Sequence, residues 1–276
     1  MAHDPVPAIT EAEAVGEVAE IFADLRDTLG VNVVNLVWRH IATFPGALAW
    51  AWATLRPIYV SGAVGMEARR LRSELVTPAL SVWPASALRC VQVDTTSEAM
   101  IRHVLASYNR SNALNLVALS ALVRHIDGAP WSAAASGVAA ASLSEPGIEG
   151  ALPKLLALDE VTKDTADLIL KINLLADRNH GRIVASMYRH LAHWPGFLAL
   201  CYAQLAPLAA DGSITQMIES ALAQASQAGA RLQSQLTVTP RPETVADIRQ
   251  ASIDFIEHAI SKMVPVAKLI EASLTK

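Results

Sequence analysis

Side chains with the polarity for ligand chemistry gather most densely at residues 108–112, whose sequence is YNRSN. Two amides, a guanidinium and two hydroxyl groups could together hold a carboxylate or a carbonyl if this run is buried. Apolar segments lie on both sides of the run, which favours burial. An asparagine-rich turn between two helices would have the same composition, so both interpretations stay open.

Two pairs of ionisable residues also have helical spacing. Asp254 and His258 are four residues apart and could form an oriented acid–base pair, although surface helices carry many such pairs. His190 and His193 are three residues apart, a spacing that occurs in helical metal sites. No H-E-x-x-H motif, paired E-x-x-H motif or cysteine ligand accompanies them. The sequence therefore predicts no metal site.

These groups belong to a chain that repeats part of itself. The segment 33–64 matches the segment 183–214 without a gap, and 12 of the 32 aligned positions are identical at a constant separation of 150 residues. Arg39 thus pairs with Arg189. An internal duplication is the natural interpretation. With only two copies, each should form a half of several helices, related to the other by a pseudo-two-fold axis near Val37 and Met187. A shared site would lie between the halves.

The spacing of apolar residues predicts an all-α fold, in which internally duplicated helical halves form a pseudo-dimer with a site between them. The N-terminal half is expected at 1–130, a linker of small residues at 131–155 and the C-terminal half at 156–276, with the halves packed as one unit. The proline of the F-P-G corner at residues 44–46 can launch the helix that follows it. Helices are expected at residues 11–30, 34–41, 47–59, 66–75, 97–108, 113–126, 160–177, 183–193, 196–208, 214–236 and 242–262, and a last one should reach residue 274.

Composition excludes several classes of function. The net charge of −4 comes without a basic stripe, so nucleic acid is not an expected partner. No apolar run reaches about 20 residues and no export signal begins the chain, so we expect no membrane partner and a cytoplasmic location. No glycine-rich turn links a strand to a helix, so the sequence predicts no nucleotide cofactor. Cys90 and Cys201 are solitary in apolar surroundings and are expected to be buried free thiols.

Several segments, in their order and spacing, resemble the group I 2-haloacid dehalogenases, whose members are D-specific or non-stereospecific. The segments are EIFADLRDTLG, RHIATFPGALAWAW, VLASYNRSNALNLVALSAL, ALPKLLALDEVT and LAHWPGFL. The similarity spans nearly the whole chain, and the two F/W-P-G corners and the Y-N-x-x-N run are its most specific parts. It implies an all-α pseudo-dimer that hydrolyses the C2–halogen bond of small 2-haloalkanoic acids without metal or cofactor. An aspartate would activate a water that attacks C2 directly, with inversion.

Two positions match the residues that this resemblance implies. The pocket asparagine falls on Asn112, and the serine that precedes the family's catalytic aspartate falls on Ser186. These two side chains are therefore expected to contact the substrate.

Four other positions of the implied site depart from the family. The aspartate position holds Met187, the two aromatic pocket positions hold Val33 and Leu36, and a pocket tyrosine position falls on Ser252. A thioether cannot deprotonate water, so the family's mechanism cannot run through Met187. Val33 and Leu36, in place of aromatic rings, would enlarge or reshape the pocket.

The sequence therefore predicts a dehalogenase-type protein that takes a small organic (halo)carboxylic acid and releases little or no halide. One alternative is a non-catalytic binder of a small organic acid, anchored by Asn112, Ser186 and Arg110. Another is an active hydrolase that uses a displaced acid, for which Asp177 and Asp254 are the candidates. No catalytic residue is assigned, and a homodimer is left open.

Overall fold

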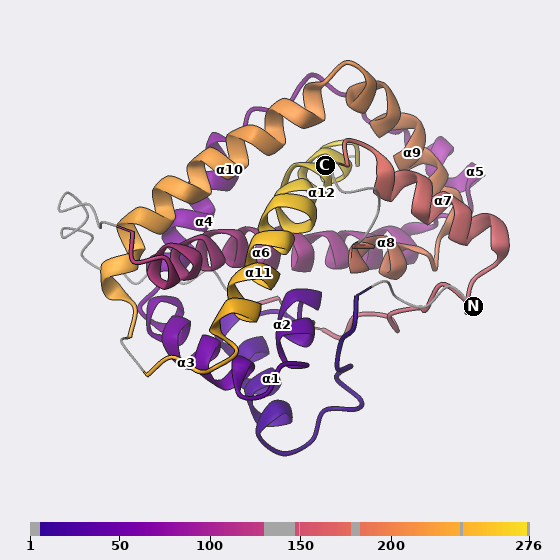
Figure 1. Ribbon diagram of the computed structural model, residues 1–276. Helices are drawn as coiled ribbons and strands as arrows, with labels where there is room; N and C mark the ends of the chain where they lie inside the picture. The colour runs from indigo at the N-terminus through magenta and orange to yellow at the C-terminus, as the bar shows by residue number, and fades with distance from the viewer. Residues whose placement is uncertain (1–5, 130–146, 149, 178–182, 238–239, 275–276) are drawn as a thin grey trace.

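The computed structural model describes residues 6–129, 147–148, 150–177, 183–237 and 240–274, and within these ranges it contains helices and no strand (Figure 1). The predicted all-α fold is thereby confirmed. The helices are α1 (Gly16–Leu29), α2 (Leu36–Ile41), α3 (Ala47–Val60), α4 (Ala63–Glu74), α5 (Ala85–Cys90), α6 (Thr95–Ile126), α7 (Lys163–Leu174), α8 (Ser186–Leu191), α9 (Pro195–Ala210), α10 (Ser213–Leu232), α11 (Val245–Phe255) and α12 (Ser261–Ala272).

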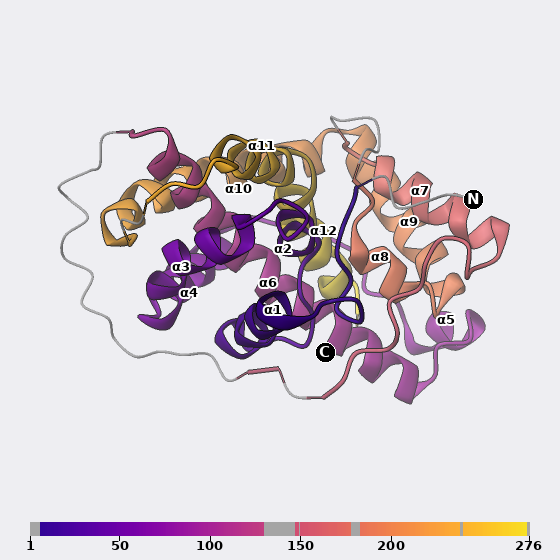
Figure 2. The same ribbon diagram turned by 60° about the horizontal axis from the view of Figure 1, so that its bottom comes forward.

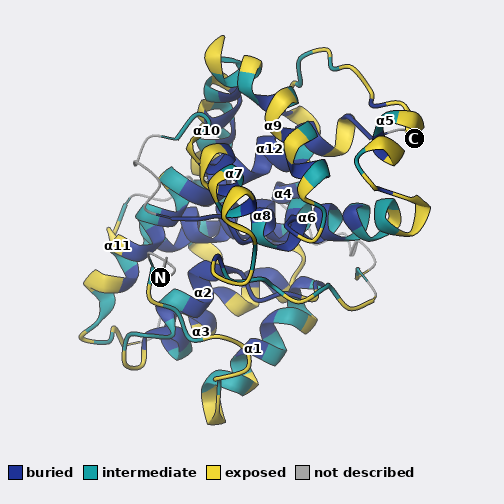
Figure 3. Ribbon diagram, turned by 90° about the vertical axis from the view of Figure 1, so that its right-hand side faces the viewer, coloured by how far each residue is buried: buried dark blue, intermediate teal, exposed yellow. Residues whose placement is uncertain are grey.

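The long helix α6 passes through the middle of the molecule and packs against α3, α4, α8, α10, α11 and α12. Helices α1 to α4 lie on one side of it, and α7, α8 and α9 lie on the other (Figure 2). Figure 3 shows α12 and the middle of α6 among the buried parts, whereas α1 and α9 carry exposed residues. The core therefore follows α6, and groups on α6 can reach both sides.

The sequence expectation of two helices separated by a kink at residues 108–112 is wrong, because α6 is continuous over 32 residues. Its start is capped by Asp94, whose side chain accepts a hydrogen bond from the Ser97 backbone N–H at 2.8 Å. The polar residues of the run keep helical geometry because their side chains bond to other elements instead of to the local backbone. Arg110, for example, donates to the Leu29 carbonyl at 2.7 Å.

The repeated corners start their helices differently. Pro195 is the first residue of α9, one residue before the expected start at 196. Pro45 instead precedes α3, which begins after Gly46 in a left-handed conformation. The expected start of this helix at residue 47 is confirmed, although Pro45 is not its first residue.

The helix bounds follow the repeat of the sequence closely. Helices α2 and α8 begin and end 150 residues apart, and α4 and α10 both begin after a glycine, Gly62 or Gly212. These glycines have φ values of 78° and 84°, which side chains with a Cβ rarely adopt. Superposition of the two halves about a pseudo-two-fold axis stays a prediction. The domain boundaries also stay predictions, because most of the expected linker at 131–155 lies outside the described residues.

The expected helix at 242–262 is interrupted by one turn of π-helix, Ile256–Ile260, between α11 and α12. A π-turn inserts extra backbone into a helix and shifts the faces on either side of it, and such turns are frequent at functional sites. Asp254 and His258 fall on either side of its start, and Asp254 accepts instead from the Gln250 amide at 2.8 Å. His258 Nε2 lies 3.9 Å from the Glu257 carboxylate.

Two further sequence expectations concern cysteines and apolar helices. Cys201 is buried as predicted, but Cys90 is exposed, because the short helix α5 buries only Leu88. Within the described ranges, no single helix is long and apolar enough to cross a membrane. The pair Pro195–Ala210 and Ser213–Gln235 meets that criterion only when taken together, and it is bent by 80°.

Candidate functional site

A small central cavity lies where α2, α6, α8, the π-turn and α12 meet. Its volume is about 30 Å³, which is room for one or two water molecules. Both residues expected near the pseudo-two-fold axis line it. The lining side chains are Asn35, Leu36, Val37, Tyr108, Asn112, Ile183, Ala185, Ser186, Met187, Phe255, Ala259, Ile260 and Met263. No carboxylate occurs among these residues.

Two buried asparagines give the cavity its polar edge. Asn35 uses its side-chain N–H groups to donate to Ser111 Oγ at 3.1 Å and to Asn112 Oδ1 at 3.2 Å. The remaining atoms, Asn35 Oδ1 and Asn112 Nδ2, are buried without a hydrogen bond to any described residue. A buried amide donor and acceptor beside a cavity of this size indicate a place for a water or a polar ligand atom.

Met187 supplies an apolar face of the same cavity. Its exposed fraction is 0%, and Met263 and Leu36 line the cavity with it. A thioether is a weak acceptor and no base, so this position can pack against a ligand but cannot take a proton from water. Methionines are also flexible, so Met187 and Met263 can move without disturbing the backbone.

Two side-chain contacts link the cavity to a larger opening beyond it, and we call them together the partition. Arg39 donates from a terminal guanidinium nitrogen to Ser186 Oγ at 3.2 Å. The Tyr108 hydroxyl lies 2.7 Å from His190 Nδ1. Ser186 and Tyr108 line the central cavity, whereas Arg39 and His190 line the larger opening. The partition therefore lies between the two spaces, and its hydrogen bonds link a group that lines one space to a group that lines the other.

The protonation of the partition follows from burial and from nearby charge. Burial, followed by His193, Arg189 and Arg39, lowers the pKa of His190 to about 4. The neutral ring also has a bond to the Pro153 carbonyl, which only a ring N–H can supply. Nδ1 is then the acceptor for the Tyr108 hydroxyl proton. Burial raises the pKa of Tyr108, and the positive charges of the two arginines partly oppose this rise.

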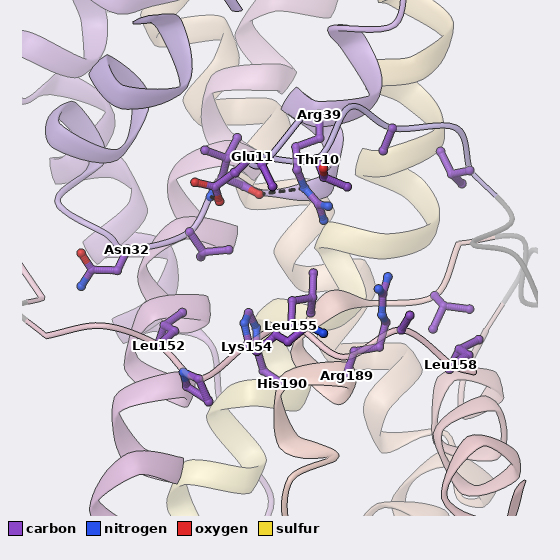
Figure 4. Close-up of a pocket in the computed structure, with 18 of the residues that line it drawn as sticks. Thr10, Glu11, Asn32, Arg39, Leu152, Lys154, Leu155, Leu158, Arg189 and His190 are labelled. Carbon is purple, nitrogen blue, oxygen red and sulfur yellow. Dashed lines mark hydrogen bonds between the residues drawn. The ribbon is translucent and has the colours of Figure 1, made fainter. Parts of the chain in front are cut away.

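The larger opening is a cleft of about 620 Å³ between the N-terminal segment, α2, α8 and the segment 152–159. Its polar side chains include Glu11, Asn32, Arg39, Arg189 and His190, which Figure 4 shows on opposing walls. Aliphatic side chains fill much of the remaining surface. The cleft is about twenty times the volume of the central cavity and is the only one of the two with charged groups.

The structure brings four of the six sequence-derived site residues to one cavity. Leu36, Asn112, Ser186 and Met187 line the central cavity. Val33 lies in the neighbouring cleft instead. Ser252 is buried in α11, where its hydroxyl donates to the Ile248 carbonyl at 2.7 Å, and it lines neither space.

Neither proposed replacement acid reaches the central cavity. Asp177 faces the ammonium of Lys262 at 3.4 Å, and the two side chains are 4% and 3% exposed. Asp254 bonds to Gln250. Arg110, a suggested anchor, donates to the Leu29 carbonyl and lines a different surface hollow.

Sequence reasoning missed the partition and the π-turn. The pairing of Tyr108 with His190 depends on how α6 crosses α8, which spacing along the chain does not reveal. His193, the other histidine of the pair weighed as a metal site, bonds through Nε2 to the Lys154 carbonyl at 2.8 Å. Among the described residues, no group of three or more His, Cys, Asp or Glu side chains gathers around one point.

Comparison with known proteins gives this geometry a context. No family model matches the sequence. The chain is 28% identical over 209 residues to a configuration-inverting 2-haloacid dehalogenase of Alcaligenes xylosoxydans xylosoxydans, covering 74% of the chain and 69% of that relative. A configuration-inverting 2-haloacid dehalogenase of Pseudomonas sp. (strain 113) is 26% identical over 213 residues, covering 73% and 68%.

Solved structures extend the likeness over the full length. A D-2-haloacid dehalogenase mutant in complex with D-2-CPA matches with a TM-score of 0.74 at 18% identity, covering 98% of this chain and 96% of that one. A D-2-haloacid dehalogenase in complex with L-LA matches with a TM-score of 0.70 at 18% identity, covering 97% and 96%. The chain therefore has the all-α fold of the D-2-haloacid dehalogenases, and its sequence is similar to the configuration-inverting enzymes.

Proposed function

We propose that this protein binds small 2-haloalkanoic acids, or organic acids of the same size, at the central cavity and releases little or no halide from them. The ligand class is supported by the similarity to 2-haloacid dehalogenases over about three quarters of the chain. It is also supported by the buried Asn35 oxygen and Asn112 nitrogen, which can bond to a ligand hydroxyl, carboxyl or bound water.

The cavity must expand to accept such a ligand, because about 30 Å³ holds only one or two waters. The groups that border it are suited to expansion. Met187 and Met263 have flexible side chains, and the π-turn places a less regular stretch of backbone along the cavity. Binding therefore selects a more open arrangement of this wall, which lowers the apparent affinity.

One observation carries the proposal of little or no halide release. Met187 occupies the position where the resemblance places the water-activating aspartate, and no described residue that lines the cavity has a carboxylate. A positioned general base typically contributes about 10²–10⁴-fold to a rate. Without one at this point, the attack of water on C2 should be slow even when the acid is bound.

Two measurements on the unmodified protein test the proposal. Thermal unfolding with D- and L-2-chloropropionate, lactate and propionate should show a stabilisation that grows with ligand concentration, as mass action requires. Ion chromatography should find little or no chloride above the rate without protein. Turnover at an ordinary enzymatic rate of about 1–10³ per second would overturn the proposal of inactivity. Absence of any stabilisation would overturn acid binding.

A second candidate, hydrolysis with a different base, is favoured by the Tyr108–His190 contact. A water in the cavity could pass a proton to the Tyr108 oxygen while the Tyr108 proton moves to His190 Nδ1, 2.7 Å away. With a pKa of about 4, His190 would be about as basic as an ordinary aspartate. If chloride is released, His190→Gln should abolish the release under this candidate. Activity that survives both His190→Gln and Tyr108→Phe would exclude it.

A further inference from the structure

The cleft beside the central cavity has the makings of a separate anion site. Arg39 extends from α2 and Arg189 from α8, and Figure 4 shows their guanidinium groups pointing toward one another across the open space. Arg39 is 5% exposed and is held in place by bonds from its side chain to the Val34 carbonyl and to Ser186 Oγ. Arg189 is fixed by its bond to the Leu156 carbonyl at 2.6 Å.

Other charged groups of the cleft are largely neutralised by partners at its edge. Glu11 bonds to Arg26 and accepts from the Val34 backbone N–H at 3.0 Å. Lys154 is paired with Glu160. Asp159 is a further carboxylate of the lining, and Arg39 and Arg189 together bring two positive charges to the cleft. Their effect is felt by His190, since both contribute to its lowered pKa.

Most of the remaining lining of the cleft is aliphatic. Side chains from all its walls contribute, among them Val33, Val34, Leu152, Leu155, Leu158 and Val184. A volume of about 620 Å³ lies within the range of pockets that take ligands much larger than a three-carbon acid. A ligand that suits both features has one planar anionic group, which matches the guanidinium fork, and a hydrocarbon chain.

We propose that the cleft binds an aliphatic carboxylic acid of about six to ten carbons, whose carboxylate lies between Arg39 and Arg189 and whose chain lies on the aliphatic wall. The site is distinct from the central cavity, because none of its lining residues is shared with that cavity. The partition joins the two, so an acid in the cleft contacts Arg39 and His190 directly and reaches Ser186 and Tyr108 through them.

Isothermal titration with sodium octanoate tests this site on the unmodified protein. We expect saturable binding, and we expect the uncharged octanamide to bind about 10–100-fold more weakly, because it loses the charge-assisted hydrogen bonds. Equal affinity for octanoate and octanamide would overturn the proposal, as would the absence of saturable octanoate binding. Neither comparison depends on the folding of a variant.

Variants then locate the carboxylate. Arg189→Gln should weaken octanoate binding at least about tenfold, and Arg189→Lys should weaken it less, because the charge remains while the planar fork is lost. Arg70→Gln removes an exposed arginine of α4 and should leave binding unchanged. Stabilisation by 2-chloropropionate should persist in Arg189→Gln, which separates this site from the proposed acid site in the central cavity. Octanoate binding that Arg189→Gln leaves intact would contradict the assignment.

Discussion

The surroundings of α2 and α8 hold their buried polar groups in different ways. Beside α2, the Trp38 indole N–H and the Tyr59 hydroxyl both donate to Asn115 Oδ1, each at 2.9 Å. All three side chains are buried and none carries a charge. Neutral hydrogen bonds are thus sufficient to hold α2, α3 and α6 together at this point.

Beside α8, one of the two corresponding positions holds the cation of a buried ion pair. Tyr188 stands 150 residues after Trp38. The segment 255–269 also resembles 108–122 at a separation of 147 residues, which pairs Lys262 with Asn115. Lys262 donates to the Asn173 carbonyl and faces Asp177 at 3.4 Å. Burial lowers the pKa of Lys262, and the negative charge of Asp177 opposes this. The C-terminal part of the repeat therefore carries charge where the N-terminal part carries an amide.

This difference shows why an acid close to α8 does not replace the missing aspartate. Asp177 is buried, but its carboxylate faces Lys262 and does not line the central cavity. A carboxylate that accepts a hydrogen bond from an ammonium is committed to structure. Charge thus lies near the central cavity, while no described residue that lines the cavity supplies a carboxylate base.

Removal of the buried cation should have the largest effect. Lys262→Met takes away the ammonium that faces Asp177 and should lower the free energy of unfolding by about 3–5 kcal/mol. Asn115→Leu, the matched change beside α2, should cost about 1–3 kcal/mol, because it leaves two buried neutral donors without an acceptor. Urea denaturation measures both values.

The double variant Lys262→Met/Asp177→Leu provides the control for that comparison. It removes both charges together and should recover much of the lost stability. An Asn115→Leu variant that is destabilised as much as Lys262→Met would show that the two networks do not differ as described.

A smaller effect should appear in the dependence of stability on pH. The pKa of His190 falls from 6.5 to about 4 on folding, so the unfolded chain binds more protons than the folded one between these values. The contribution of His190 is therefore complete above about pH 6.5 and is lost as the pH falls toward 4. Its upper limit is about 3 kcal/mol, at 1.36 kcal/mol per pKa unit.

Denaturation midpoints between pH 7 and pH 4 measure this contribution. His190→Gln should flatten the decline over that window. His40→Gln makes the same replacement at the equivalent place in α2, where the ring bonds to the Pro7 carbonyl near the surface. The difference between the two slopes belongs to the buried ring, and identical slopes in the two variants would contradict the role given to His190.

The sequence was sufficient for the parts of this structure that depend on local spacing. The apolar periodicity predicted helices, and the bounds of α2 and α8 agree with the 150-residue repeat. The family resemblance placed Leu36, Asn112, Ser186 and Met187 at one site, and these four do line one cavity. Leu36 lies in α2, Asn112 in α6, and Ser186 and Met187 in α8, and these three helices meet at the cavity.

The features that spacing did not predict depend on tertiary partners. The expected kink near Asn112 is absent, because Asn35 and other distant groups satisfy the polar side chains of α6. The π-turn and the partition arise where α6, α8 and α11 cross. Ser252 turns to its own helix, whose backbone carbonyl is the nearest acceptor for its hydroxyl. Crossings of this kind leave no periodic signal in the chain.

The role of Met187 is tested most directly by halide release from Met187→Asp, with Met187→Asn as the control. Asparagine has nearly the same shape as aspartate but is not a base. Both variants should be less stable than the parent, because a polar group replaces a fully buried thioether.

Chloride release from 2-chloropropionate, measured for the parent and both variants under the same conditions, decides the matter. Met187→Asp should release chloride faster than the parent. The increase should be smaller than the factor of about 10²–10⁴ that a well-placed base contributes, because Val33 and Leu36 still differ from the implied pocket. Met187→Asn should stay at the parent's level. Strong release by the parent that neither variant changes would contradict the account, because the base would then lie elsewhere.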